Sequence, residues 1–352
     1  MVFSHGMTHR LFFLGQSILL LALLIWPVAV SAAEPKVEVV LSGLAFPTGV
    51  AVQPDSGSIY VAESGRGRVV RVVEGQLQEA IVGFPTAATA ENERLPTLGS
   101  RGPLGLAFLS ARGLVVGGGG GPLGEDALWV FELPEAATEP LEARAAPARF
   151  SLPAAETELG EGDFYGLAVS SDTIFATCRG NAKKGWVGRL ERDDAGKLTA
   201  MQRWLATTEQ TQVQAPLAAT LNPRGLLVIG QAGSFDQPHD ARVSFYRPDE
   251  PRLLLQLATG LFDITGLAYG SDGQLYATDF AHLDPAAGGL FRLVATLVEG
   301  RQTCRAERIV TLDRPTALAQ GKDGAWYVTV FGPTAANDGQ ATGKLLRIVT
   351  DH

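Results

Sequence analysis

Short apolar segments separated by polar turns recur along the chain between Pro47 and Val349, always in the same order. Each copy opens with a strand of small and apolar residues, continues through a turn rich in Asp and Gly, and enters a second, more apolar strand. The copies begin at Pro47, Pro103, Tyr165, Pro216, Thr265 and Pro315, roughly 50 residues apart. A repeat of this length built from short strands is typical of the blades of a β-propeller.

Each copy except the sixth is predicted to supply four strands. The second strands, such as residues 59–62 and 326–329, are apolar at consecutive positions, as expected where both faces of a sheet are covered. The third strands, such as residues 68–72 and 344–348, end in an Arg followed by an apolar residue. We expect this recurring Arg to be an exposed partner on the outward face of its strand. The chain is therefore predicted to be all-β, with four-stranded antiparallel blades.

One strand is left over ahead of the first copy. Residues 37–41 form an apolar strand, and the sixth copy has no fourth strand after residues 344–348. Pairing the N-terminal strand with the sixth copy would complete that sheet and remove a free edge. We therefore predict a six-bladed β-propeller whose ring is closed by the N-terminal strand.

The first 33 residues have the layout of a secretory signal peptide. His9 and Arg10 precede an apolar run over residues 11–30, and small residues follow as far as Ala33. The alternative is an uncleaved membrane anchor, because the run approaches the length that spans a bilayer. We expect residues 1–33 to be a signal peptide, residues 34–352 to be a single propeller domain, and the product to be secreted or periplasmic, with no membrane attachment after cleavage.

The charge of the chain bears on nucleic-acid binding, and its two cysteines raise the question of a disulfide. The net charge is −8, and no basic stripe of the kind that binds nucleic acid is present. Two cysteines in an exported protein suggest a disulfide. However, Cys178 and Cys304 fall in the third and fifth copies, at opposite faces of the predicted ring, too far apart to be bridged. We therefore expect two free thiols.

Long polar loops are expected on one face of the predicted ring. Strand direction alternates, so the loops before the first strands and after the second strands emerge on the same face, here called the upper face. The opposite face has tight turns, and functional residues on rigid scaffolds concentrate in the longer loops. Our candidates for binding a small-molecule or protein ligand are Glu63, Arg66, Arg179, Asn181 and Asp279. The alternative, which is the more common case for residues of this kind, is a polar side chain in a solvated loop.

A second group of candidates could bind a divalent metal. His239 and His282 occupy equivalent loops of the fourth and fifth copies, and Asp240 and Asp284 lie close by in the sequence. Imidazole and carboxylate are suitable ligands for Zn, Mn or Fe, and the same pair can perform acid–base chemistry. The alternative is that these are capping and turn residues of solvated loops.

Other catalytic patterns are not indicated. The glycine run at residues 117–121 lacks the Lys-Ser/Thr of a phosphate-binding loop, so a flexible or closely packed loop is expected there. There is no G-x-S-x-G elbow and no His between Arg10 and His239, which argues against a Ser–His hydrolase.

The first copy resembles the NHL repeat through Pro47-Thr48-Gly49-Val50-Ala51-Val52 and residues 59–65, with Glu63 where that repeat has Asp. The fifth and sixth copies resemble it at residues 273–279 and 324–329. The resemblance implies a six-bladed propeller. It implies no single activity, because similar propellers include binding modules, lyases and hydrolases.

The chain also resembles two enzyme families, and each resemblance implies particular site residues. Soluble quinoprotein glucose/sorbosone dehydrogenases have a first blade like that around Glu63 and Gly67-Arg68, but they use a catalytic His in the first half of the ring, where this chain has none. Gluconolactonase-like propellers hold a divalent metal partly through Asn and Asp just before the Gly of the first strand. The residues at that position here are Thr48, Leu104, Tyr165, Leu217, Thr265 and Thr316.

The sequence therefore favours an exported NHL-like propeller that binds a ligand or protein through its upper-face loops. The alternative is a metal- or quinone-assisted enzyme at the upper mouth of the ring, either a sugar dehydrogenase-like oxidoreductase, a lactonase or a lyase.

Overall fold

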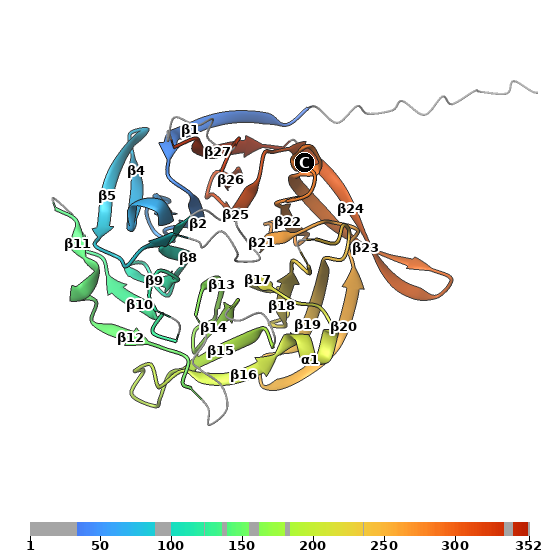
Figure 1. Cartoon of the computed structure of the whole chain (residues 1–352), viewed down its shortest axis with the longest axis horizontal. Coiled ribbons are helices and arrows are strands. Elements are labelled where there is room, and N and C mark those ends of the chain that lie inside the picture. The colour runs from blue at the N-terminus through green and yellow to red at the C-terminus, as the bar shows by residue number, and fades with distance from the viewer. Residues whose placement is uncertain are drawn as a thin grey trace, which may run out of the picture. The chain divides into compact units, whose positions relative to one another are not determined.

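Six antiparallel sheets surround a central axis, each with its first strand innermost (Figure 1). This arrangement is that of a six-bladed β-propeller with four-stranded blades, and it confirms the fold predicted from the repeats. The structure is a computed structural model that describes residues 34–88, 100–122, 124–135, 139–154, 162–179, 184–234, 236–333 and 341–350. The predicted signal peptide (residues 1–33) and Asn181 lie outside the described residues.

The strands of the first three blades follow chain order from the axis outward. Blade 1 contains β2 (Pro47–Val52), β3 (Ile59–Glu63), β4 (Arg68–Val73) and β5 (Gln76–Val82). Blade 2 contains β8 (Pro103–Phe108), β9 (Gly113–Gly118), β10 (Leu128–Glu132) and β12 (Ala148–Phe150). Blade 3 contains β13 (Phe164–Val169), β14 (Thr173–Cys178), β15 (Trp186–Glu191) and β16 (Gln202–Ala206).

The other three blades repeat this order, except that the last one takes its outer strand from the N-terminal part of the chain. Blade 4 contains β17 (Pro216–Leu221), β18 (Leu227–Gln231), β19 (Arg242–Arg247) and β20 (Glu250–Ala258). Blade 5 contains β21 (Ile264–Tyr269), β22 (Leu275–Asp279), β23 (Gly289–Val298) and β24 (Arg301–Thr311). Blade 6 contains β25 (Pro315–Gln320), β26 (Trp326–Val330), β27 (Gly343–Val349) and β1 (Lys36–Leu44).

The N-terminal strand closes the ring, as predicted from the sequence. Strand β1 pairs antiparallel with β27, with Val39 opposite Leu346, and so completes blade 6. Because this pairing covers the outer edge of β27, the two ends of the propeller are held in one sheet.

One feature of blade 1 was not predicted. The segment between β10 and β12 contains the short strand β11 (Leu141–Glu142). It pairs in parallel with β5, with Leu141 opposite Ile81, and gives blade 1 a fifth strand. The connection therefore joins blade 2 to its neighbour. The short helix α1 (Thr207–Thr211) and the small ribbon β6 (Ala87–Ala88) with β7 (Ser100–Arg101) complete the regular elements used here.

The small residue in each first strand is explained by the close approach of neighbouring blades. A Cβ atom built on Gly49 would lie 2.1 Å from the carbonyl oxygen of Leu104, and one on Gly105 would lie 2.1 Å from that of Tyr165. Backbone atoms cannot give way as a flexible side chain can, so a glycine is required at these two positions. The repeated glycine thus serves packing around the axis.

Apolar side chains of the second and third strands fill the space between blades. Tyr60, Trp129 and Phe131 share one cluster between blades 1 and 2, and Tyr276 and Trp326 share another between blades 5 and 6. Burying an aliphatic or aromatic side chain of this kind contributes about 1.5–3 kcal/mol. The packed blades therefore form the rigid scaffold on which the upper-face loops are placed.

Cys178 is buried and Cys304 half-buried, and both are free thiols. In the part of the chain that the structure describes, we find no helix with the length and apolar character needed to cross a bilayer.

Candidate functional site

The upper face is where each second strand ends beside the start of its first strand. Glu63 lies opposite Pro47, Gln231 opposite Pro216, and Asp279 opposite Ile264. Glu63 and Asp279, two candidates from the sequence, therefore hold the same position in blades 1 and 5. Their contacts show what a carboxylate does at this position.

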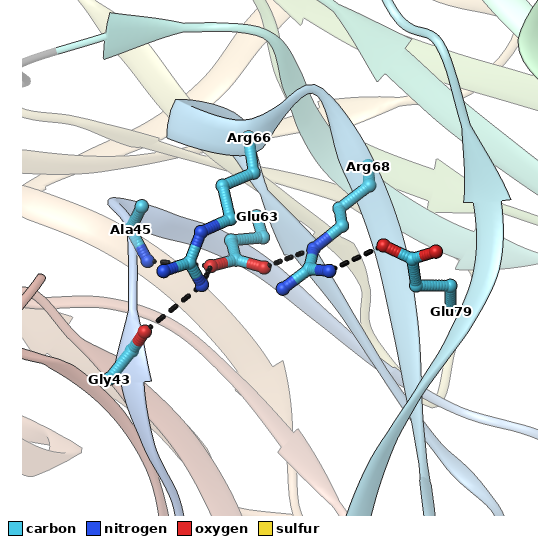
Figure 2. Close-up of polar contacts among 6 residues, drawn as sticks. All are labelled: Gly43, Ala45, Glu63, Arg66, Arg68 and Glu79. Carbon is cyan, nitrogen blue, oxygen red and sulfur yellow. Dashed lines mark hydrogen bonds and ion pairs between the residues drawn. The ribbon is translucent and has the colours of Figure 1, made fainter.

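Glu63 is fully buried at the centre of an ion-pair network (Figure 2). Its Oε1 accepts hydrogen bonds from the Ala45 backbone N–H at 2.8 Å and from Arg66 at 2.6 Å, and its Oε2 accepts one from Arg68 at 2.6 Å. Arg68 also pairs with Glu79. These contacts tie the connection between β1 and β2 to the second and third strands of blade 1. Glu63 therefore has a structural role, and Arg66 belongs to the same network.

Asp279 has the corresponding role in blade 5. Its Oδ1 accepts hydrogen bonds from the backbone N–H groups of Asp263 at 2.7 Å and Ala281 at 3.2 Å. Its Oδ2 accepts one from Phe262 at 3.0 Å. Burial raises the pKa of Asp279, although these hydrogen bonds oppose the rise. The carboxylate thus joins the loop before β21 to the loop after β22.

Asp263 is a buried acid that the sequence did not single out. It is 2% exposed, and its Oδ2 accepts a hydrogen bond of 2.7 Å from the His282 backbone N–H. Burial raises the pKa of Asp263 to about 7, and the nearby charges of Asp279 and Asp240 add to the rise. A lone Asp in a loop gives no sequence signal for this, because the shift depends on what covers the carboxyl group.

The four residues proposed as metal ligands each make their own contacts. His239 donates from Nδ1 to the Gly260 carbonyl oxygen at 2.7 Å, Asp240 accepts from the Ser234 N–H at 2.9 Å, and Asp284 accepts from the Ala286 N–H at 3.2 Å. Burial, followed by the charge of Arg314, lowers the pKa of His282. The described residues contain no group of three or more His, Cys, Asp or Glu side chains arranged to hold a metal. The metal site remains a prediction that no contact of these residues supports.

Arg179 is a buried cation at the upper end of blade 3. It follows β14 directly and is 8% exposed. Its guanidinium faces the Oδ2 of Asp163 at 3.5 Å, which is long for a charged hydrogen bond. Asp163 is also buried and has a φ of 57°, a left-handed conformation that Asp tolerates better than most residues. Among the candidate binding residues, Arg179 is therefore the one whose side-chain N–H donors are least used by the fold.

Aromatic side chains of several blades meet near the start of β13, which follows Asp163 in the chain. Tyr165 of blade 3 packs against Phe280 and Phe331, which follow the second strands of blades 5 and 6. Phe331 makes edge contacts with Phe280 and Phe46, with ring centroids 5.6 Å and 5.4 Å apart. Because blades 3 and 6 lie opposite each other in the ring, Tyr165 reaches across the axis. We call Phe46, Tyr165, Phe280 and Phe331 the aromatic group.

A cavity along the axis shares Tyr165 with the aromatic group and is walled by the first strands. Thr48, Tyr165, Leu217, Gly266 and Leu318 are among its lining residues, and its empty volume is about 440 Å³ with open solvent included. One hint of this arrangement is present in the sequence, a Tyr at position 165 where other copies have Thr or Leu.

The position used for metal binding in gluconolactonase-like propellers serves contacts between blades here. Thr48 donates to the Pro103 carbonyl oxygen at 3.1 Å, Thr265 to that of Pro315 at 2.8 Å, and Thr316 to that of Pro47 at 2.7 Å. Each hydroxyl therefore joins the first strand of its own blade to that of the next blade.

The glycine run at residues 117–121 is closely packed. A Cβ atom on Gly117 would lie 2.1 Å from the Phe164 carbonyl oxygen, and one on Gly120 would lie 2.1 Å from that of Pro85. These two glycines therefore fit between neighbouring segments that leave no room for side chains.

The protein resembles known proteins in its fold. No protein-family model matches the sequence, and the search of curated proteins found no match. The structure is similar to a putative oxidoreductase (glucose dehydrogenase) of Thermus thermophilus, with 20% identity, a TM-score of 0.61, and coverage of 90% of this chain and 100% of that one.

Two further solved structures show the same likeness. The pyrroloquinoline quinone-bound aldose sugar dehydrogenase of Streptomyces coelicolor has 11% identity and a TM-score of 0.56, over 90% of this chain and 99% of that one. A putative gluconolactonase has 13% identity and a TM-score of 0.53, over 91% and 93% of the two chains. The protein is thus a six-bladed β-propeller whose fold neighbours are sugar dehydrogenases and gluconolactonase-like propellers, as the sequence resemblance implied.

Proposed function

We propose that the protein is an exported binding propeller that holds a small organic anion at its upper face, between Arg179 and the aromatic group. Arg179 is the observation that carries this proposal. A buried guanidinium without a well-formed partner is costly, and its single described ion pair is long, at 3.5 Å. An anionic ligand would use the remaining N–H donors, since a guanidinium matches the geometry of a carboxylate.

The other candidate residues support binding over catalysis. Glu63, Arg66 and Asp279 are engaged in holding upper-face loops, so they offer little to a reacting substrate. Within the aromatic group, Phe46 is exposed and Tyr165 half-buried, so these two rings offer apolar contact to a ligand, with the buried Phe280 and Phe331 packed behind them. A planar or partly apolar carboxylate is the ligand class that suits both the cation and these rings.

A screen of thermal unfolding with organic acids tests this proposal. A ligand present at about 100 times its Kd would stabilise the folded protein by about 2.7 kcal/mol. We expect a rise in Tm with aromatic carboxylates such as trimesate, and little change with neutral sugars. Equal responses to charged and neutral compounds would contradict the proposal.

A quinone-dependent oxidoreductase is the second candidate. It is favoured by the fold neighbour solved with pyrroloquinoline quinone, which is a planar polycarboxylate that suits Arg179 and the aromatic group. When bound, such a quinone would accept electrons from a sugar. Asp263 is the described acid whose pKa, about 7, suits proton transfer. Reduction of a dye by glucose or another aldose after loading with the quinone, lost in Asp263→Asn, would favour this candidate over simple binding.

A further inference from the structure

The outer strands of blade 5 extend beyond their sheet as a two-stranded arm. Strand β23 pairs with β22 only as far as Leu293, yet its pairing with β24 continues to Val298 opposite Arg301. The resulting hairpin projects from the rim of the ring (Figure 1). We call residues 294–305 the arm.

The arm is a regular and preorganised structure. Glu299 and Gly300 form its turn with positive φ values of 50° and 76°, as tight hairpins require. Just below the turn, the hydroxyl groups of Thr296 and Thr303 lie 2.7 Å apart across the two strands. The arm therefore presents its apex in a fixed orientation.

The apex is unusually apolar for a position so open to solvent. Leu297 is 76% exposed and Val298 is 55% exposed, and they are neighbours at the end of the hairpin. Leaving both in water gives up the free energy that burial would supply. Because consecutive residues of a strand point to opposite faces, the two side chains lie on either side of the tip, and only a partner that surrounds the tip can cover both.

Basic residues flank the apex on one face of the arm. The register places Arg301 opposite Val298 and Arg305 opposite Val294, so both arginines lie on the face that carries Val298. Arg305 pairs with Glu307, whereas among the described residues Arg301 has no acidic partner. The turn itself holds the acid Glu299, so the basic character of this face rests on Arg301, beside Val298.

Contrary to the expectation from the sequence of no membrane attachment after cleavage, we propose that the arm docks the propeller onto an anionic phospholipid surface, with Leu297 and Val298 inserted at the headgroup level and Arg301 beside the lipid phosphates. The size of the apex argues for lipid over protein. A stable protein interface buries about 800 Å² on each partner, far more than two side chains at a convex tip can supply. Shallow insertion into a bilayer needs no complementary partner, and basic residues near the surface strengthen it.

Sedimentation with vesicles of phosphatidylglycerol or of phosphatidylcholine tests this proposal. The full-length protein is used throughout, so any binding by residues 1–33 is common to every variant. We expect the wild type to sediment with phosphatidylglycerol and much less with phosphatidylcholine. The double variant Leu297→Ser, Val298→Ser should bind roughly tenfold more weakly. The control Leu254→Ser, which alters an exposed apolar residue of β20, should bind as the wild type does.

The charge contribution has its own readout. Arg301→Glu should weaken binding to phosphatidylglycerol at low salt, and the difference from the wild type should shrink at high salt as the charges are screened. Circular dichroism confirms that each variant is folded. Failure of the wild type to sediment with phosphatidylglycerol would overturn the proposal, as would an apex variant that binds normally. Equal binding to the two lipids would overturn the role assigned to Arg301.

Discussion

The hydroxyl of Thr316 donates a hydrogen bond of 2.7 Å to the carbonyl oxygen of Pro47, which lies 269 positions away in the sequence. This contact joins the first strand of blade 6 to that of blade 1, close to the axis. The pairing of β1 with β27 closes the ring at its rim. The ring is therefore closed both near the axis and at the rim.

Thr316→Val removes the inner contact while keeping the shape of the side chain. We expect the free energy of unfolding to fall by about 1 kcal/mol, with a further cost because the Pro47 carbonyl is left without its donor. Urea denaturation measures the change. Thr311→Val, at the exposed end of β24, is the control and should change stability by less than about 0.5 kcal/mol.

Glu63→Ala tests the network of Figure 2. The change leaves Arg68 largely buried without its main partner, and breaking a buried pair in this way typically costs about 3–5 kcal/mol. Glu79→Ala removes the other partner of Arg68, which is more exposed, and should cost about 1 kcal/mol or less. Similar losses in the two variants, measured by chemical denaturation, would show that burial of Glu63 has no special importance.

Gly49→Ala tests the close approach of the first strands. The added Cβ would lie 2.1 Å from the Leu104 carbonyl oxygen, so the two strands would have to separate. We expect a loss of stability beyond about 3 kcal/mol, or no folded protein. The reverse change at the equivalent position of blade 6, Ala317→Gly, should cost only about 0.5–1 kcal/mol. A folded Gly49→Ala variant with normal Tm would refute the packing argument.

The pKa of Asp263 predicts how stability depends on pH. Burial raises this pKa from 3.8 to about 7, so the folded protein binds a proton more tightly than the unfolded chain does. Stability should therefore fall as the pH rises from about 4 to above 7, by roughly 1.4 kcal/mol for each unit of pKa difference. Asp263→Asn keeps an oxygen that accepts from His282 but cannot ionise. Its unfolding free energy should lose less between pH about 5 and about 9 than that of the wild type, and parallel pH profiles would contradict this.

The repeated blades could be predicted from the sequence. The contacts between loops that lie far apart in the chain could not. The spacing of the copies and the leftover strand at residues 37–41 predicted the blades and their closure, because strand pattern and pairing are largely local properties. Glu63 and Asp279 were recognised as candidates, but their roles depend on the backbone N–H groups that reach them.

The remaining site features depend on the closed ring. Tyr165 meets Phe331 only because blades 3 and 6 face each other across the axis, and Asp263 is perturbed only because the loops of blade 5 bury it. Little in the local sequence around these residues distinguishes them from ordinary strand and loop positions.

The central claim is that Arg179 gives the upper face an anion-binding site, and calorimetric titration tests it most directly. Trimesate and pyrroloquinoline quinone serve as probes, since the first has the carboxylates and aromatic ring without the quinone. We predict saturable binding by the wild type, a loss of about 2 kcal/mol or more in Arg179→Ala, and unchanged binding in Arg224→Ala, whose side chain is exposed in the turn between β17 and β18. Absence of binding by the wild type, or equal affinity in the Arg179→Ala variant, would contradict the account.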